Sequence, residues 1–438
     1  MTPATMVRGV VETGKAAWQD AVDRWGGMGR TARATTLLLA FMIVGGAILR
    51  IQGIGFPPRN TFDEQFYGPT AHHILLGVPD LHDHHPPLGK LLGAIGLLLF
   101  GYNSVGWRFI PLCFGLQTII IAYWLAREIF ASRRAGWLAA AFVAADGFFI
   151  SYSRIALPDG MLTCLVLWSV LAVVTARTWR GVAVAAVLVG AAMSIKWSGL
   201  QALAPAVVAL LLFCRAPWHA IFWFGLAPVL HLLIWMAGLH LMGHASDPLA
   251  VWSVILSSRT SLHDLAQHDN PLASRWYSWP ALYHPIVVKL SSYGTTSRYA
   301  SNAGNPVLWF PAGLLVMGLP LTRGLTAWRA RWRNYWPFDP SFNKAVFVLA
   351  VGWAAMFVPL GVYMGQHTFF YHYLSSYAFA LVLLAGVAAK LERRWPRAVL
   401  VFVTLAVLMA VYFAPVWGEF PLTVEQANRR LIFLPWRP

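Results

Sequence analysis

One short stretch of the chain, RNTFDEQFYGPTAHHILLGVPDLHDHHPPLGK, concentrates residues that can do acid–base chemistry. It runs from Arg59 to Lys90 and holds four carboxylates and five histidines, although only 11% of the chain is charged. Asp63 and Glu64 are adjacent in it, and a carboxylate hydrogen-bonded to a hydroxyl group can take its proton as a new bond to oxygen forms. This pair is therefore a candidate general base.

The histidines of the same stretch are candidates of a different kind. His72 and His73 are adjacent, and a second cluster spans His82–His85. Imidazole nitrogens and carboxylates are common ligands of divalent metals, so a metal site is one interpretation of the cluster. We nevertheless expect no metal. The cations described next can stabilise a leaving phosphate group without one, although the sequence leaves a divalent ion open.

Three cations stand at the ends of apolar segments without an obvious acidic partner nearby in the sequence: Arg108, Arg154 and Lys196. Charges near hydrocarbon are costly, which favours a functional role. The alternative is that each side chain extends to lipid headgroups or pairs with a nearby acid. Beside a carboxylate, the cations suit a reaction at a lipid-linked phosphate, because an anionic leaving group needs electrostatic stabilisation and not protonation. We expect a single inverting displacement.

The composition places these groups in a membrane protein. Of the 438 residues, 58% are hydrophobic, and the mean hydropathy of +0.58 is far above that of a soluble globular chain. The net charge of +16 would suggest nucleic acid in a soluble protein, but here the positive-inside rule accounts for most of it, so no nucleic-acid partner is expected. The three cysteines lie in apolar runs and predict neither a disulfide framework nor a zinc site.

The apolar runs predict an all-α polytopic protein with about 11 transmembrane helices. One further apolar segment, 85–101, is short, begins with Pro-Pro and contains Lys90. We interpret it as a juxtamembrane helix in the first outer loop. The predicted spans are 34–56, 107–130, 134–150, 159–176, 181–195, 199–214, 218–242, 305–322, 345–364, 370–389 and 398–417.

The distribution of basic residues predicts the topology. If 85–101 does not cross the membrane, most of the 33 Lys and Arg residues fall in the N-terminal segment and in cytoplasmic loops. A crossing there would place the later basic loops outside, against the positive-inside rule. The N-terminus is then cytoplasmic, and the C-terminus lies outside together with the candidate site.

These assignments divide the chain into segments. The N-terminal segment is either an interfacial helix or a partly ordered tail. The first outer loop carries the candidate carboxylates, and a second large outer loop suits a folded cap at the membrane surface. The boundaries are 1–33 for the N-terminal segment, 34–417 for the integral membrane domain, 57–106 for the first outer loop, 243–304 for the cap loop and 418–438 for the outer C-terminal tail.

Six motifs give the chain a resemblance to a known family. FDEQFYG, DHHPPLGKLL, GYNSVGWRFIPLCFG, SRIALPDGML, SIKWSGL and FFYHY resemble, in order and spacing, the protein O-mannosyltransferases. The resemblance covers most of the chain, although the region 199–300 adds little. It implies the C-type glycosyltransferase (GT-C) fold and transfer of mannose from a polyprenyl-phosphate-mannose donor to Ser or Thr hydroxyls of secreted or membrane proteins.

The resemblance also implies roles for residues that match its motifs. Asp63 is expected to be the catalytic base, with Glu64 supporting it. Arg108, Arg154 and Lys196 are expected to bind the donor phosphate or to shape its site. Further residues that could contact substrate or shape the site are His85, Lys90, Trp107, Asp159, Trp197, Tyr371 and His372.

Some features depart from the family pattern or leave alternatives open. Eukaryotic members carry a folded sugar-binding-like domain in the large outer loop, and 243–304 is too short for one, which indicates a bacterial-type member in the inner membrane. Asp159 is either a partner of Arg154 or a charge favoured at a helix N-terminus. The alternative functions are a sister C-type transferase that moves another polyprenyl-linked sugar, such as aminoarabinose, to lipid A or a glycan, and, less favoured, a transporter.

Overall fold

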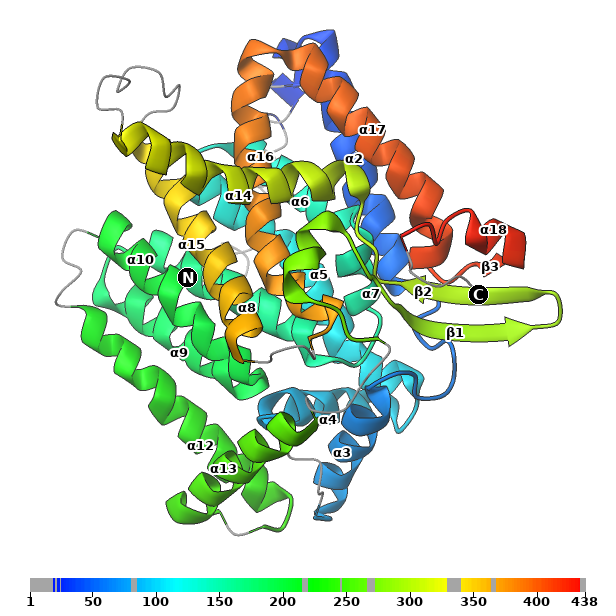
Figure 1. Ribbon diagram of the computed structural model, residues 1–438, viewed down its shortest axis with the longest axis vertical. Helices are drawn as coiled ribbons and strands as arrows, with labels where there is room; N and C mark the ends of the chain where they lie inside the picture. Colours follow the sequence, from blue (N-terminus) through cyan, green and yellow to red (C-terminus); the bar gives the residue numbers. More distant parts are fainter. Residues whose placement is uncertain are drawn as a thin grey trace, which may run out of the picture.

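The computed structural model describes residues 19, 22–23, 25–79, 85–214, 220–244, 246–265, 272–328, 340–363 and 368–433. Helices make up most of this part of the chain, and a small sheet lies at one edge of the helical bundle (Figure 1). The predicted helical membrane fold is confirmed in outline. Most of the predicted N-terminal segment, 1–33, falls outside the described residues.

Long apolar helices form the body of the protein. Within the described residues, 6 helices are long and apolar enough to cross a membrane, and each coincides with a predicted span. They are α2 (Arg30–Ile51), α5 (Ser104–Ile129), the segment Ile221–Leu241 made of η2 (Ile221–Gly225) and α12 (Leu226–Leu241), α15 (Pro340–Tyr363), the segment Phe370–Arg394 made of η5 (Phe370–Tyr373) and α16 (Leu374–Arg394), and α17 (Pro396–Trp417).

The other predicted spans coincide with helices that do not meet the same measure of length and hydropathy over their described residues. The number of membrane crossings, about 11, therefore stays a prediction. These helices are α6 (Arg133–Ala144) with α7 (Gly147–Tyr152), α8 (Pro158–Val174), α9 (Trp179–Ile195), η1 (Trp197–Ala202) with α10 (Leu203–Phe213), and α14 (Pro306–Trp328).

The prediction of one continuous helix over 134–150 is wrong. The helix breaks after Ala144, and Asp146 begins α7 as its N-cap, accepting a hydrogen bond from the backbone N–H of Phe148 at 3.0 Å. The other oxygen of Asp146 accepts from the backbone N–H of Asn305 at 2.8 Å and from the hydroxyl of Tyr377 at 3.0 Å. Because side-chain oxygens of Asp compete for backbone donors, the residue favours a new helix start over a helix interior.

Two short helices occupy 57–106, the predicted first outer loop. They are α3 (Glu64–Leu76) and α4 (Leu88–Phe100), each of 13 residues. At 1.5 Å per residue each is about 20 Å long, shorter than the roughly 30 Å hydrocarbon core. The helix α4 packs closely on α5, since a side chain at Gly96 would lie 2.2 Å from the carbonyl oxygen of Gly106. The interpretation of 85–101 as a juxtamembrane helix stays a prediction.

The cap loop contains strands that the all-α prediction missed. Besides α13 (Pro248–Leu265) and η3 (Trp276–Ala281), it forms an antiparallel hairpin of β1 (Val287–Tyr293) and β2 (Thr296–Ser301). The third strand, β3 (Pro421–Leu422), comes from the tail after α17, and the sheet order is β1-β2-β3. A short helix, α18 (Val424–Asn428), follows it. The C-terminal tail is thereby joined to the cap loop.

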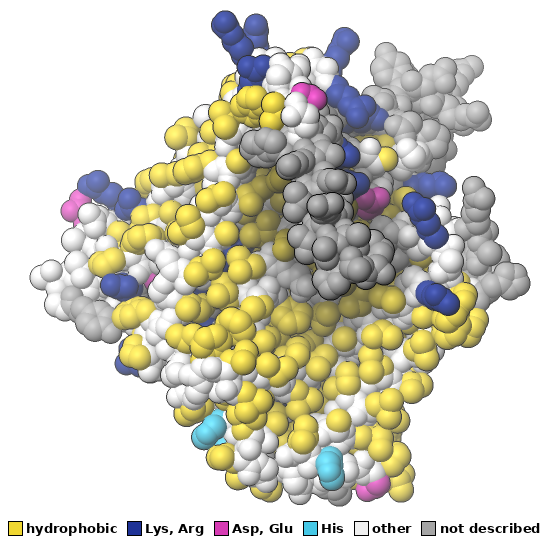
Figure 2. Space-filling model, turned by 180° about the vertical axis from the view of Figure 1, so that it is seen from behind, with side chains coloured by type: hydrophobic (Ala, Val, Ile, Leu, Met, Phe, Trp, Pro, Cys, Tyr) yellow, Lys and Arg dark blue, Asp and Glu magenta, His cyan; other side chains and the backbone are white. Residues whose placement is uncertain are grey.

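The helix α16 lies at the centre of the bundle. Of the candidate spans, the segment that contains α16 has the largest share of buried residues, 83% of its spanning stretch. It contacts α6, α8, α14, α15 and α17 (Figure 1). Apolar side chains cover a broad lower part of the face seen in Figure 2, whereas Lys and Arg side chains lie around the α16–α17 turn and along both edges of the view. Such a face suits contact with lipid.

Candidate active site

Asp63 lies immediately before α3, at its N-cap position, and its side chain makes no capping hydrogen bond. The preceding residue, Phe62, has a φ of 52°, a region that bulky residues rarely adopt. Its ring meets the ring of Tyr371 edge-on, with centroids 6.1 Å apart. The first outer loop thus meets the segment that begins α16, and Asp63 is half-buried at this junction.

Glu64 has a different environment from its neighbour. Its two oxygens accept hydrogen bonds from Nε and Nη2 of Arg108, both at 2.7 Å, and both side chains are fully buried. It also accepts from the backbone N–H of Ala156 at 3.0 Å and from Thr61. Burial alone would raise the pKa of Glu64, but the hydrogen bonds from Arg108, the charges of Lys289 and Arg108 and the bond from Ala156 outweigh it, so the pKa is lowered. Glu64 stays ionised and holds the loop to α5.

The remaining N–H groups of Arg108 donate hydrogen bonds to the same loop. Its Nη1 donates to the carbonyl oxygens of Ile54, Phe56 and Pro57, and its Nη2 also donates to that of Arg59. These contacts assign its guanidinium to loop anchoring. Its predicted role in binding the donor phosphate stays a prediction that the hydrogen bonds do not favour.

Arg154 belongs to a second buried network. Its Nε donates to Glu419 at 3.2 Å, and its Nη1 donates to the carbonyl oxygens of Leu49, Arg50 and Gln52 at the end of α2. Lys289 of β1 also donates to Glu419, at 3.1 Å. The alternative that Asp159 is the partner of Arg154 is wrong, since Glu419, 265 positions away in the sequence, fills that place.

The sequence interpretation missed Glu419 and Lys289. Both are buried, at 3% exposed each, and Lys289 also donates to the carbonyl oxygen of Arg154 at 2.6 Å. Burial lowers the pKa of Lys289 to about 8, although Glu419 counteracts it. A lysine within a strand and a glutamate after the last span carry no local signal of pairing, because the pairing depends on the sheet that joins β3 to β2.

Lys196 pairs with Asp159. The ammonium group lies 2.8 Å from Oδ1 of the carboxylate, and it also lies over the ring of Tyr371 at 5.2 Å from the centroid. Lys196 ends α9, and Asp159 lies in the first turn of α8. Both are buried, yet neither is enclosed by a network as extensive as that of Arg108.

Asp63 interacts with the charges of Lys196 and Asp159. Burial raises the pKa of Asp63 from 3.8 to about 6, while the charge of Lys196 lowers it and that of Asp159 raises it. Tyr67 and Tyr371 interact with the charges of both carboxylates. The structure therefore gathers a base of raised pKa, a cation and phenol groups from the first outer loop, α8, α9 and η5. This arrangement can deprotonate a hydroxyl group and stabilise a nearby anion.

The remaining predicted residues divide between this centre and its surroundings. His85 stacks on Tyr67 with ring centroids 6.5 Å apart, which places it beside the centre. His372 lies next to Tyr371, and its Nδ1 accepts from the backbone N–H of Phe369 at 3.3 Å. Lys90, in the first turn of α4, is buried at 3% exposed.

The two tryptophans pack into a neighbouring apolar cluster. Trp107 is 6% exposed, and its ring lies 5.5 Å from that of Tyr102. Trp197 stacks on Trp235 with centroids 5.9 Å apart. Trp107 and Trp235 are buried members of the same cluster, with Trp197 packed against it. Their direct contact with substrate stays a prediction.

Within the described residues, no group of three or more His, Cys, Asp or Glu is placed to hold a metal ion, and the metal interpretation of His82–His85 stays a prediction. Of the cluster, 82–84 lie outside the described residues. His72 stacks on Tyr102, with centroids 4.3 Å apart.

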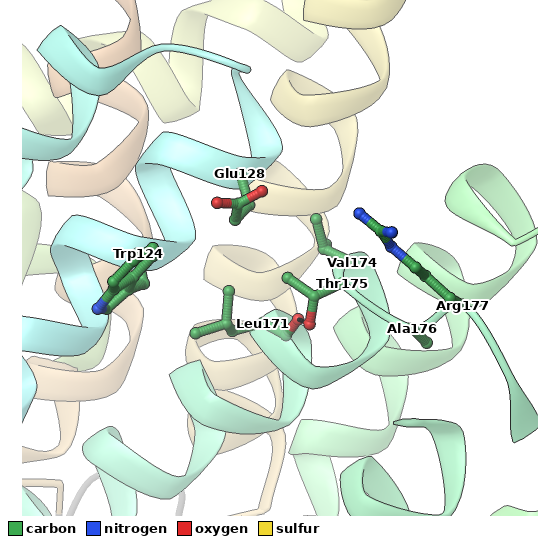
Figure 3. Close-up of a pocket in the computed structure, with 7 residues that line it drawn as sticks. All are labelled: Trp124, Glu128, Leu171, Val174, Thr175, Ala176 and Arg177. Carbon is green, nitrogen blue, oxygen red and sulfur yellow. Dashed lines mark hydrogen bonds between the residues drawn. The ribbon is translucent and has the colours of Figure 1, made fainter. Parts of the chain in front are cut away.

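A surface hollow of about 430 Å³ lies elsewhere, between the last turn of α5 and the loop after α8 (Figure 3). Trp124 on its wall is 17 positions after Trp107, about 25 Å along α5. Trp107 precedes Arg108, which binds Glu64 beside Asp63, so the hollow is remote from Asp63. Its lining residues are Trp124, Glu128, Leu171, Val174, Thr175, Ala176 and Arg177.

Comparison with known proteins bears on what this arrangement is for. Residues 84–240 match the family described as dolichyl-phosphate-mannose-protein mannosyltransferase, and 251–436 match the C-terminal four-span region of protein O-mannosyltransferase. A polyprenol-phosphate-mannose–protein mannosyltransferase of Mycolicibacterium smegmatis is 25% identical over 95% of this chain and 94% of its own. Enzymes of the same name from Mycobacterium tuberculosis and Corynebacterium glutamicum are 24% and 23% identical, over 86% and 92% of this chain and 86% and 94% of theirs.

Solved structures show the fold. The Saccharomyces cerevisiae protein O-mannosyltransferase Pmt1-Pmt2 complex bound to the sugar donor aligns with a TM-score of 0.74, at 14% identity, over 90% of this chain and 92% of that chain. ArnT from Cupriavidus metallidurans bound to undecaprenyl phosphate aligns with a TM-score of 0.56, at 16% identity, over 87% and 76%. The expected GT-C fold is thus confirmed. The two family matches and the full-length relatives agree with the six motifs, and the chain belongs to the protein O-mannosyltransferase family as a membrane mannosyltransferase.

Proposed function

We propose that this enzyme transfers mannose from a polyprenyl-phosphate-mannose donor to Ser or Thr hydroxyls of exported proteins, at the outer face of a bacterial inner membrane. The observation that carries the mechanism is that Asp63, half-buried and without a capping bond, lies within reach of the charges of the Lys196–Asp159 pair. The names of the full-length relatives support the donor and the protein acceptor.

Asp63 acts as the base. With a pKa raised by burial to about 6, it is a stronger base than an exposed Asp, yet about 90% of it is ionised at pH 7. It takes the proton of the acceptor hydroxyl as that oxygen bonds to the anomeric carbon, while the bond from that carbon to the phosphate oxygen breaks. Attack opposite the leaving phosphate inverts the configuration in one step.

Lys196 stabilises the leaving phosphate. Its ammonium group has three N–H donors, and the bond to Asp159 occupies one of them. A phosphate leaves as an anion, so a nearby cation stabilises the developing charge without giving up a proton. Glu64, held by Arg108, fixes the position of Asp63 by anchoring the first turn of α3.

The test is a transfer assay with purified protein, radiolabelled polyprenyl-phosphate mannose and a Ser/Thr-rich peptide. We expect transfer by the wild type and a loss of about 100-fold or more in kcat with Asp63→Asn, the range for removal of a general base. Gln65→Ala, an exposed change in the same helical turn, serves as the control and keeps full activity.

Parallel reactions supply a polyprenyl-phosphate aminoarabinose donor with lipid A as acceptor. Transfer of that sugar alone would replace the proposed function with that of the sister transferases. Full activity of Asp63→Asn with mannose would keep the activity and refute the mechanism.

A further inference from the structure

The buried carboxylate of Asp159 has one oxygen that the ion pair does not use. Oδ1 accepts from Lys196 at 2.8 Å, while Oδ2 is buried and has no hydrogen-bond partner within the described residues. The residue as a whole is 4% exposed. A buried acceptor without a donor is costly, and native structures contain few of them.

Two other buried carboxylates show the contrast. Both oxygens of Glu64 accept hydrogen bonds, and so do both oxygens of Asp146. A charge at the helix N-terminus or a partner for Lys196 would explain why Asp159 is acidic, but neither explains an idle second oxygen. An oxygen of this kind beside a catalytic centre is suited to a donor that arrives with the substrate.

The position of Asp159 relative to the proposed chemistry identifies that donor. Its charge interacts with Asp63, Tyr67 and Tyr371, so it belongs to the same centre as the base. The proposed function places the donor phosphate on Lys196, which Asp159 itself holds. In the donor, mannose is joined to this phosphate at its anomeric carbon, which brings the neighbouring hydroxyl groups of the sugar close to the same ion pair.

We propose that Oδ2 of Asp159 accepts a hydrogen bond from a hydroxyl group of the donor sugar, which makes Asp159 a residue that determines sugar specificity. This inference rests on the proposed function. It assigns the two oxygens separate tasks, since Oδ1 holds the cation for the phosphate and Oδ2 binds the sugar attached to that phosphate.

The first test compares two lipids that differ only in the sugar. Purified wild type and Asp159→Asn are titrated with polyprenyl-phosphate mannose and with sugar-free polyprenyl phosphate. We expect the variant to bind the mannosyl lipid about 10-fold or more weakly, in line with the loss of a charge-assisted hydrogen bond. It should bind the sugar-free lipid at least as well as the wild type, because Lys196 is released from its ion pair. Retained binding also shows that the variant is folded. Equal loss for both lipids would overturn the inference.

A second test needs only the wild type for its main result. Mannosyl donors lacking one hydroxyl at a time, at carbon 2, 3, 4 or 6, are compared with the complete donor. We expect one of them to bind about 10-fold more weakly to the wild type, and Asp159→Asn to bind that donor and the complete one alike. If every deoxy donor binds the wild type as tightly as the complete mannosyl donor does, the inference is wrong even if the variant fails to fold.

The outcomes separate this inference from the proposed function. If the wild type transfers mannose and shows no dependence on any sugar hydroxyl, Asp159 only holds Lys196 and the proposed function stands. If the wild type neither binds nor transfers the mannosyl donor, the proposed function itself fails.

Discussion

Replacing Asp63, the proposed catalytic base, should stabilise the protein. Folding raises the pKa of Asp63 from 3.8 to about 6, chiefly by burial, so the folded state disfavours its charged form. Below pH 3.8 the carboxyl group is protonated in both states and costs nothing. The cost grows as the pH rises from 3.8 to about 6 and is constant above that. Asp63→Asn removes this charge, so the variant should exceed the wild type in stability at neutral pH.

The magnitude follows from the size of the pKa shift. A rise from 3.8 to about 6 corresponds to about 3 kcal/mol, at 1.36 kcal/mol per unit. Asp63 is only half-buried, and solvent screening reduces this to about 1–3 kcal/mol. For a chain of this length the gain amounts to a few degrees in Tm.

The assay is thermal unfolding of both proteins in one detergent, from pH 4 to pH 8. The two Tm values should converge near pH 4 and separate above pH 6, with Asp63→Asn the higher. Glu64→Gln is the matched control of opposite sign. The pKa of Glu64 is lowered in the folded state, so its stabilisation is present above its unfolded pKa and is lost as the pH falls through the folded one.

Glu64→Gln removes the charge of Glu64 and leaves Arg108 buried without a counter-ion, at a cost in folding free energy of about 3–5 kcal/mol. A Tm difference between wild type and Asp63→Asn that does not change with pH, or an Asn variant that is less stable at pH 7.5, would refute the account of Asp63.

Three further results are expected. In the transfer assay, kcat/KM should fall about 10-fold per pH unit below about pH 6, as Asp63 becomes protonated, and a rate that is flat down to pH 4.5 would contradict this. Glu419→Gln should lower Tm by leaving two buried cations without their ion-pair partner, and Lys289→Met in the same chain should recover much of the loss. If the double variant is no more stable than Glu419→Gln, the network is not a unit. Arg394 lies between the predicted spans 370–389 and 398–417, in a loop predicted to be cytoplasmic. In a background without native cysteines, Arg394→Cys should therefore react with impermeant thiol reagents only after the membrane is opened, and labelling from outside would reverse the predicted topology.

The sequence predicted the apolar helices well because their signal is local. A run such as that of α17 carries its own hydropathy, and the shortness of α4 can be read from its flanking Pro-Pro and Gly residues. The sheet could not be found in this way. Its third strand has only two residues and pairs with a hairpin more than a hundred positions earlier in the chain.

The candidate site was predicted as a set of residues but not as a set of partners. Motifs named Asp63, Glu64 and the three cations, whereas their pairing depends on how distant helix ends meet. Arg108 lies 44 positions from Glu64, and Lys196 lies 37 positions from Asp159. Two cations that look equivalent in sequence, Arg108 and Lys196, therefore differ in structure, since Arg108 is enclosed by carbonyl oxygens and Lys196 pairs with Asp159 over the ring of Tyr371.

The link between Glu419, Arg154 and Lys289 has a consequence for biogenesis. A ribosome synthesises Arg154 and Lys289 well before Glu419, whose place in the chain follows the last long helix. The two cations must therefore enter the assembling bundle without their acid, and the buried network closes only after α17 has been inserted and the segment behind it has been delivered to β2. A chain that stops before Glu419 would therefore leave two buried cations without their ion-pair partner.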